Sequence, residues 1–158
     1  IETAVDWTFA DHWTVFGSYA YNDSEYEDDT YDGDGALIAR TAGKTVVDTP
    51  EHLLKGELGY DDGAVFARVS ASYMSRRFFT YENDHAVEPQ TLVDLTAGYR
   101  FSGGPLLEGL EVQVNVSNLF DEDYISTINS NGSPLRGDSQ TLLVGSPRQA
   151  FVTVRKVF

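Results

Sequence analysis

Long stretches of alternating apolar and polar residues constrain this chain more than any other feature. Because successive side chains of a β-strand point to opposite faces of the sheet, this alternation predicts strands with one apolar and one polar face. It predicts an all-β chain, an antiparallel up-and-down meander of about seven long strands. The seven alternating runs are 1–9, 13–22, 52–60, 65–73, 93–101, 110–117 and 149–158.

The runs are long, and their aromatic residues are unevenly placed. With their flanking residues, we expect strands of about 10–13 residues, whereas an ordinary strand has about 5–6 and a strand that crosses a bilayer about 9–11. Trp and Tyr residues gather near the ends of the apolar faces, as in Trp7, Trp13, Tyr60 and Tyr99. Alternation alone favours a soluble antiparallel sandwich or small barrel. Strand length, the aromatic girdle and the one-sided loops described next together favour a transmembrane β-barrel instead.

The connections between the runs alternate in length. Short turns at 10–12, 61–63 and 102–109 alternate with longer connections, which are long at 22–48 and 121–146 and medium-long at 79–88. In an antiparallel meander every second connection lies at the same end of the sheet. All short turns therefore fall at one end and all long loops at the other, which is the asymmetry of outer-membrane barrels.

Charge and composition exclude several classes of function. The formal net charge is −14, which argues against nucleic acid as a partner because phosphate binding needs clustered Lys and Arg. There is no cysteine, so a disulfide scaffold, a thiolate metal site and a cysteine nucleophile are excluded. The three histidines lie far apart in sequence, and there is no H-E-x-x-H, G-x-S-x-G, P-loop or G-x-G-x-x-G motif. We expect no enzyme activity, no cofactor and no resident metal.

Two motifs in the last third of the chain resemble those of a known family. Residues 114–124 read Val-Asn-Val-Ser-Asn-Leu-Phe-Asp-Glu-Asp-Tyr, and residues 145–158 begin with Gly-Ser-Pro-Arg and end with Phe. Their order and spacing are similar to those of the closing strands of TonB-dependent outer-membrane receptors. The residues that carry the resemblance are Asn118, Leu119, Phe120, Asp121, Tyr124, Pro147, Arg148 and Phe158.

The resemblance implies a fold and a function. Receptors of this type are barrels of about 22 strands with a plugged lumen. They import a scarce ligand, commonly a ferric siderophore, with energy delivered by TonB to the N-terminal plug. We therefore expect residues 1–158 to be the C-terminal part of such a barrel, without the plug, in the bacterial outer membrane among lipid and lipopolysaccharide. The resemblance also implies that the barrel-assembly machinery reads Phe158.

Individual motif residues have expected local roles. Short polar side chains such as Asn118 and Asp121 suit a strand end, where they bond nearby backbone N–H groups. Phe120 and Tyr124 fit an outer aromatic girdle.

The segment after the fourth run is the most ligand-like. Arg76 and Arg77 suit an anionic ferric complex, while Tyr81 and His85 supply rings for stacking. Arg136 is a further candidate in the last long loop. The alternative is that these side chains mark the outer membrane interface.

The acidic stretch 23–34 holds seven carboxylates. Its start at Asp28 is similar to a calcium loop, but Ala39 stands where an EF-hand needs a bidentate Glu. The stretch therefore favours a solvated acidic loop, with opportunistic Ca²⁺ binding as the alternative.

The sequence leaves the ligand open, with cobalamin and an oligosaccharide as alternatives to a ferric siderophore. A second alternative is a soluble secreted β-sheet binding module, and a third is an outer-membrane enzyme.

Overall fold

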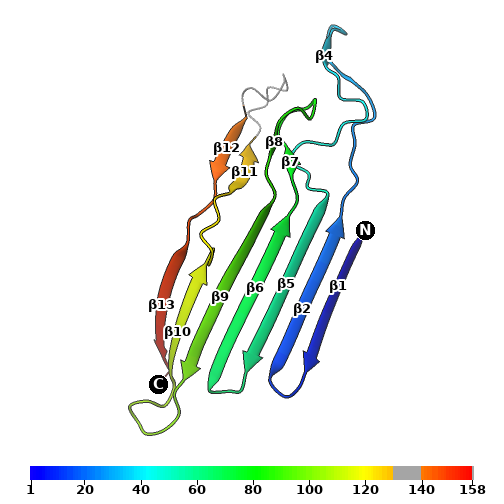
Figure 1. The fold of residues 1–158 in the computed structure, drawn as a ribbon. Helices are drawn as coiled ribbons and strands as arrows, with labels where there is room; N and C mark the ends of the chain where they lie inside the picture. Colours follow the sequence, from blue (N-terminus) through cyan, green and yellow to red (C-terminus); the bar gives the residue numbers. More distant parts are fainter. Residues whose placement is uncertain (130–139, 158) are drawn as a thin grey trace.

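A single seven-stranded antiparallel sheet dominates the computed structural model, which describes residues 1–129 and 140–157. Its strands follow one another in the order of the chain (Figure 1). They are β1 (Glu2–Phe9), β2 (Trp13–Tyr21), β5 (His52–Asp61), β6 (Val65–Met74), β9 (Gln90–Arg100), β10 (Leu110–Ser117) and β13 (Gln149–Lys156). The predicted meander of seven long strands is confirmed. The described residues contain no helix long and apolar enough to cross a membrane.

The strands are somewhat shorter than the expected 10–13 residues. They contain 8–11 residues, because flanking residues at several ends belong to turns and loops. The pairing of β2 with β5, for example, ends at Tyr21 and His52, and Asn22 already belongs to the loop. Eight to eleven residues still approach the length that a tilted strand needs to cross a bilayer.

The register places like residues on the same face across the whole sheet. Trp7 pairs with Val15 and Leu58 pairs with Val69 on the apolar face. On the polar face Thr96 pairs with Asn115 and donates a hydrogen bond to its Oδ1 at 3.1 Å. A one-residue slip would exchange the two faces, so the alternation in the sequence sets this register.

The long connections lie at one end of the sheet, which we call the loop end, and the short turns lie at the other, the turn end (Figure 1). The described C-terminal residues lie at the turn end, as the parity of the meander predicts. At the loop end each long connection carries a short antiparallel pair that the sequence pattern did not predict. These pairs are β3 (Thr30–Tyr31) with β4 (Leu37–Ala39), β7 (Arg77–Phe78) with β8 (Ala86–Val87), and β11 (Ile125–Asn129) with β12 (Thr141–Val144).

Burial separates the sheet from the loops. Among the residues that the structure describes, the buried apolar side chains are Ala39, Val87 and Ile128, and each belongs to a short strand of the loop end. The apolar face of the sheet is instead exposed, with Leu58, Val69 and others accessible. A soluble sandwich would cover this face with a second layer, whereas a barrel wall presents it to lipid.

Candidate functional site

The loop end is the candidate site, because three long loops that are far apart in sequence meet there (Figure 1). We call them the first loop (22–51), the second loop (75–89) and the third loop (118–148), of which 130–139 lie outside the described residues. The predicted ligand residue Arg136 falls in that gap.

Asn83 joins the first and second loops. Its Nδ2 donates to the Thr45 carbonyl at 2.9 Å, and its Oδ1 accepts from the Thr45 amide at 2.7 Å. Its backbone has a φ of 58°, a left-handed conformation that Asn tolerates better than most residues. The rings of Tyr26 and Tyr81 lie 6.0 Å apart across the same boundary. The two loops are therefore packed against each other.

Arg77 is buried, with 5% of its surface exposed. Its Nη1 donates to Asp48 Oδ1 in the first loop at 2.8 Å, and its Nη2 donates to the Ile125 carbonyl in the third loop at 2.6 Å. The guanidinium is thus occupied by protein groups. This placement favours a structural role for Arg77 over the ligand contact that the sequence suggested.

Arg76 lies on the surface and lines a cavity of about 290 Å³ between the first and second loops. Its guanidinium carbon is 5.0 Å from the centre of the Phe78 ring, a cation–π contact. Carboxylates from both ends of the first loop line the same cavity. The lining residues include Asn22, Asp23, Glu25, Glu51, Arg76 and Phe78.

The other two predicted ligand residues lie outside this cavity lining. Tyr81 is half-buried against Tyr26. His85 is exposed, with its Nδ1 3.1 Å from Asp84 and its ring 5.8 Å from that of Phe79. Arg76 is therefore the one predicted ligand residue, among those the structure describes, that lines the cavity. Contacts of Arg76, Tyr81 and His85 with a ligand stay predictions.

Sequence reasoning missed most of the cavity lining. Asn22 and Glu51 do not form a motif, and their shared signal is only that each lies next to the loop end of a strand. Because the alternation locates the strand ends, the residues that flank those ends could have been predicted from the sequence. Which of them meet depends on how the loops fold back.

A second cavity at the loop end is mainly apolar and measures about 460 Å³. It lies between the β7–β8 and β11–β12 pairs, and its lining residues include Phe79, Val87, Pro89, Tyr124, Ile125 and Val144.

The family-like motif residues form a clasp where β10 and β13 leave the sheet. Asn118 is buried with a φ of 49°. Its Nδ2 donates to the carbonyls of Glu122 and Ser146 at 2.9 and 3.1 Å, and its Oδ1 accepts from the Glu122 amide at 2.8 Å. Asp121 accepts from the Arg148 amide at 2.8 Å. The expected local bonding of Asn118 and Asp121 to backbone N–H groups is present.

The remaining motif residues surround this clasp. The Leu119 amide donates to the Val93 carbonyl at 2.7 Å, which ties the clasp to β9. Phe120 is 72% exposed, and the Tyr124 ring lies against Gly145 where a Cβ would collide with it. Pro147 is exposed beside Arg148, and Phe158 lies outside the described residues.

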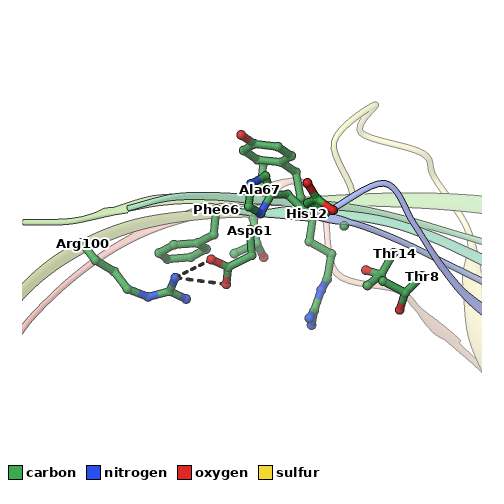
Figure 2. A pocket seen from close by; sticks show the side chains of 12 residues that line it. Thr8, His12, Thr14, Asp61, Phe66, Ala67 and Arg100 are labelled. Atoms are coloured by element: carbon green, nitrogen blue, oxygen red, sulfur yellow. Dashed lines mark hydrogen bonds and ion pairs between the residues drawn. The ribbon is translucent and has the colours of Figure 1, made fainter. Parts of the chain in front are cut away.

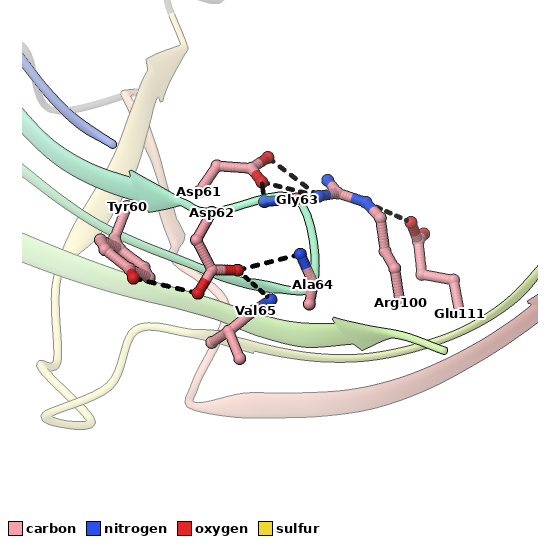
Figure 3. A network of polar contacts seen from close by, with 8 residues as sticks. All are labelled: Tyr60, Asp61, Asp62, Gly63, Ala64, Val65, Arg100 and Glu111. Atoms are coloured by element: carbon pink, nitrogen blue, oxygen red, sulfur yellow. Dashed lines mark hydrogen bonds and ion pairs between the residues drawn. The ribbon is translucent and has the colours of Figure 1, made fainter. Parts of the chain in front are cut away.

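The turn end carries a separate polar network (Figure 3). Arg100 donates to both carboxylate oxygens of Asp61, at 2.8 and 3.0 Å, and to Glu111 at 3.1 Å. Asp62 accepts from the amides of Val65 and Ala64 at 2.7 and 2.9 Å. These backbone bonds, with that from Val65 first, lower the pKa of Asp62. The network closes the turn between β5 and β6 and ties it to β9 and β10.

A shallow cavity of about 260 Å³ adjoins this network. In Figure 2 the Arg100 guanidinium is directed at the Asp61 carboxylate, with the Phe66 ring beside the pair. The guanidinium carbon is 4.3 Å from the centre of that ring. The ring lies over Gly98, where a Cβ would collide with it. These groups satisfy one another, which is the pattern of a structural contact.

No set of three acidic or histidine side chains is placed to hold a metal ion in the part of the chain that the structure describes. Within the acidic stretch, Asp32 Oδ1 accepts from the amides of Asp34 and Ala36, which shapes a turn. Calcium binding there stays a prediction.

Comparison with known proteins agrees with this architecture. A family described as TonB dependent receptor-like, beta-barrel, matches residues 1–119. The ferrioxamine B receptor of Salmonella typhimurium is 30% identical over 139 residues, which cover 85% of this chain and 18% of that protein.

Solved structures show the same fold at low identity. The siderophore receptor PiuA of Acinetobacter baumannii superposes with a TM-score of 0.76 at 18% identity, over 97% of this chain and 20% of that one. The ferric yersiniabactin uptake receptor FyuA of Yersinia pestis gives 0.73 at 19% identity, over 99% and 23%. The chain thus spans about a fifth of the length of the relatives it matches. It belongs to the TonB-dependent receptor β-barrel family, a family of transport receptors.

Proposed function

We propose that this chain is the C-terminal barrel segment of an outer-membrane receptor that takes up a ferric siderophore. One observation carries the proposal: a sheet with an exposed apolar face is joined at one end to three interlocked loops, two of which line a polar cavity. The apolar face would contact lipid and the polar face would line the lumen. The names of the relatives, a ferrioxamine B receptor and two siderophore receptors, support the ligand class.

The partners follow from this assignment. The loop end would face the exterior and lipopolysaccharide, and the turn end the periplasm. The plug would occupy the lumen and receive energy from TonB, so that ligand captured by the loops passes along the polar face. The barrel-assembly machinery would read the C-terminal strand with Phe158.

The charge of the loops favours a ferric complex without net negative charge. The first loop alone holds nine carboxylates against two basic residues, Arg40 and Lys44. Three carboxylates line the polar cavity, and the one arginine there already lies over Phe78. An anionic ferric tricatecholate would approach against this field, whereas a cationic ferric trihydroxamate would be attracted. Ferrioxamine B is therefore the first ligand to try.

Uptake of radioactive iron by cells that carry the complete receptor tests the proposal. We expect uptake of iron as ferrioxamine B, loss of uptake when the receptor gene is deleted, and competition by unlabelled ferrioxamine B. A ferric tricatecholate should compete less than an equal amount of ferrioxamine B. Import of cobalamin or an oligosaccharide without any ferric complex would contradict the siderophore assignment.

A further inference from the structure

Two adjacent arginines in the second loop have opposite environments. Arg76 is exposed and lines the polar cavity, whereas Arg77 is buried and makes no part of its lining. Burial of a guanidinium is unfavourable unless protein groups replace its water. Asp48 and the Ile125 carbonyl do so for Arg77. Partners from two other loops require an explanation beyond surface charge.

The partners of Arg77 are separated widely along the chain. Asp48 precedes it by 29 residues and Ile125 follows it by 48. The backbone repeats the first link, since the Asp48 amide donates to the Phe78 carbonyl at 2.9 Å. One side chain in the second loop therefore holds the first and third loops at once.

The same contacts set both walls of the polar cavity. Arg76 and Phe78, which flank Arg77, line one wall, and Thr49, which follows Asp48, lines the other. When Arg77 draws Asp48 toward β7, it brings these two walls together. We propose that Arg77 is a positioning residue that locks the three loops into one unit and shapes the cavity without touching the ligand. The ligand part of this inference rests on the proposed function.

The chemistry of arginine suits this role. A planar guanidinium donates in fixed directions to two partners, and here they are a carboxylate and a carbonyl on different loops. A lysine would keep the charge but lacks the fork that reaches both partners in a fixed geometry. The conservative substitution is therefore informative: it should keep part of the coupling, whereas an uncharged residue should lose it.

The test uses the complete receptor with Arg77→Gln, Arg77→Lys and Asp48→Asn. Arg40→Gln is the matched control, since Arg40 is an exposed arginine whose side chain makes no ion pair with any residue that the structure describes. Spin labels at Asp34 and Thr127, both exposed, report the distance between the first and third loops. This chain has no cysteine of its own, so within it labelling is confined to the introduced sites.

We expect a narrow distance distribution in the wild type and in Arg40→Gln, and a broad one in Arg77→Gln. The dissociation constant for ferrioxamine B should rise about tenfold in Arg77→Gln, within the range of roughly 5–150-fold typical of coupling between sites. Arg77→Lys and Asp48→Asn should fall between wild type and Arg77→Gln on both measurements. Heat-modifiable migration in gels shows whether each barrel has assembled.

Two results would overturn the proposal: an unchanged distance distribution in Arg77→Gln, or broadening that appears equally in Arg40→Gln. If Arg77→Gln does not assemble, the distance distribution of Asp48→Asn decides, and an unchanged distribution there would overturn the proposal. The Asp48 side chain is 41% exposed, so this substitution opens no cavity in a buried core. The distances need no ligand. If no ferric complex binds the wild type, the proposed function is wrong. The measured distances between the loops would still test the role of Arg77.

Discussion

The sheet and the loop end of this molecule are stabilised in opposite ways. Among the described residues, the buried side chains larger than hydrogen lie in the loops or at their junction with the sheet, as Val87, Arg77 and Asn118 illustrate. The sheet has continuous backbone pairing but leaves Leu58, Val69 and Val114 accessible. The difference indicates that the loops are organised by protein contacts, whereas the sheet depends on a surrounding apolar phase. A soluble domain would show the reverse distribution.

The largest effect is expected from a charge placed on the apolar face of the sheet, which tests whether that face contacts an apolar phase. Val69 lies on β6 between Leu58 and Leu95 and is 41% exposed. Val69→Arg should destabilise the receptor by about 2–4 kcal/mol, the cost of Arg at the bilayer midplane in barrels. Urea unfolding in lipid vesicles measures it.

Ser70→Arg provides the matched control for this variant. Ser70 is the next residue of β6 and pairs with Glu57 and Asp94 on the polar face. An arginine there should change the unfolding free energy far less. Equal destabilisation by both variants would contradict the assignment of one face to lipid and the other to the lumen.

A smaller effect is expected at the clasp that joins the sheet to the third loop. Asn118→Ala removes three hydrogen bonds of a buried side chain and places Ala at a φ of 49°. Carbonyls of Glu122 and Ser146 would lose their donor, so about 1–3 kcal/mol of stability should be lost. The unfolding midpoint in urea measures this loss.

The same variant also tests whether the clasp belongs to the loop end or to the sheet. Hydrogen exchange in Asn118→Ala should increase in the amides of Glu122 and Gly145, which belong to the clasp region, and stay unchanged in β5 and β6. Increased exchange throughout the sheet would contradict the view that the clasp belongs to the loop end.

The smallest expected effect lies at the turn end. The amides of Val65 and Ala64 lower the pKa of the Asp62 carboxyl, so its ionised form favours the folded turn. This contribution is complete above the ordinary aspartate pKa of about 3.9 and is lost as the pH falls through the lowered value. Wild type should therefore exceed Asp62→Asn in melting temperature at neutral pH, and the gap should close on acidification. A gap that widens as the pH falls would contradict this role.

Much of the sheet could be predicted from the sequence, since strand existence, face and order depend on local alternation and connection length. The family assignment from the motifs at 114–124 and 145–158 is confirmed. The expected ligand residues are a different matter. Arg76 and Arg77 are adjacent and alike in sequence, yet one is exposed at a cavity and the other is buried between loops.

The alternating sequence is enough to specify the apolar and polar faces of the sheet, and the connection lengths are enough to specify its loop end and its turn end. A period of two is a property of each strand alone, and turn length is a property of each connection alone. Only the tertiary structure decided that Asp48, Arg77 and Ile125 meet, and that Asn83 holds Thr45. Those contacts join residues 29 to 48 positions apart. Such pairings depend on how whole loops fold back on one another, which no local pattern in the chain specifies.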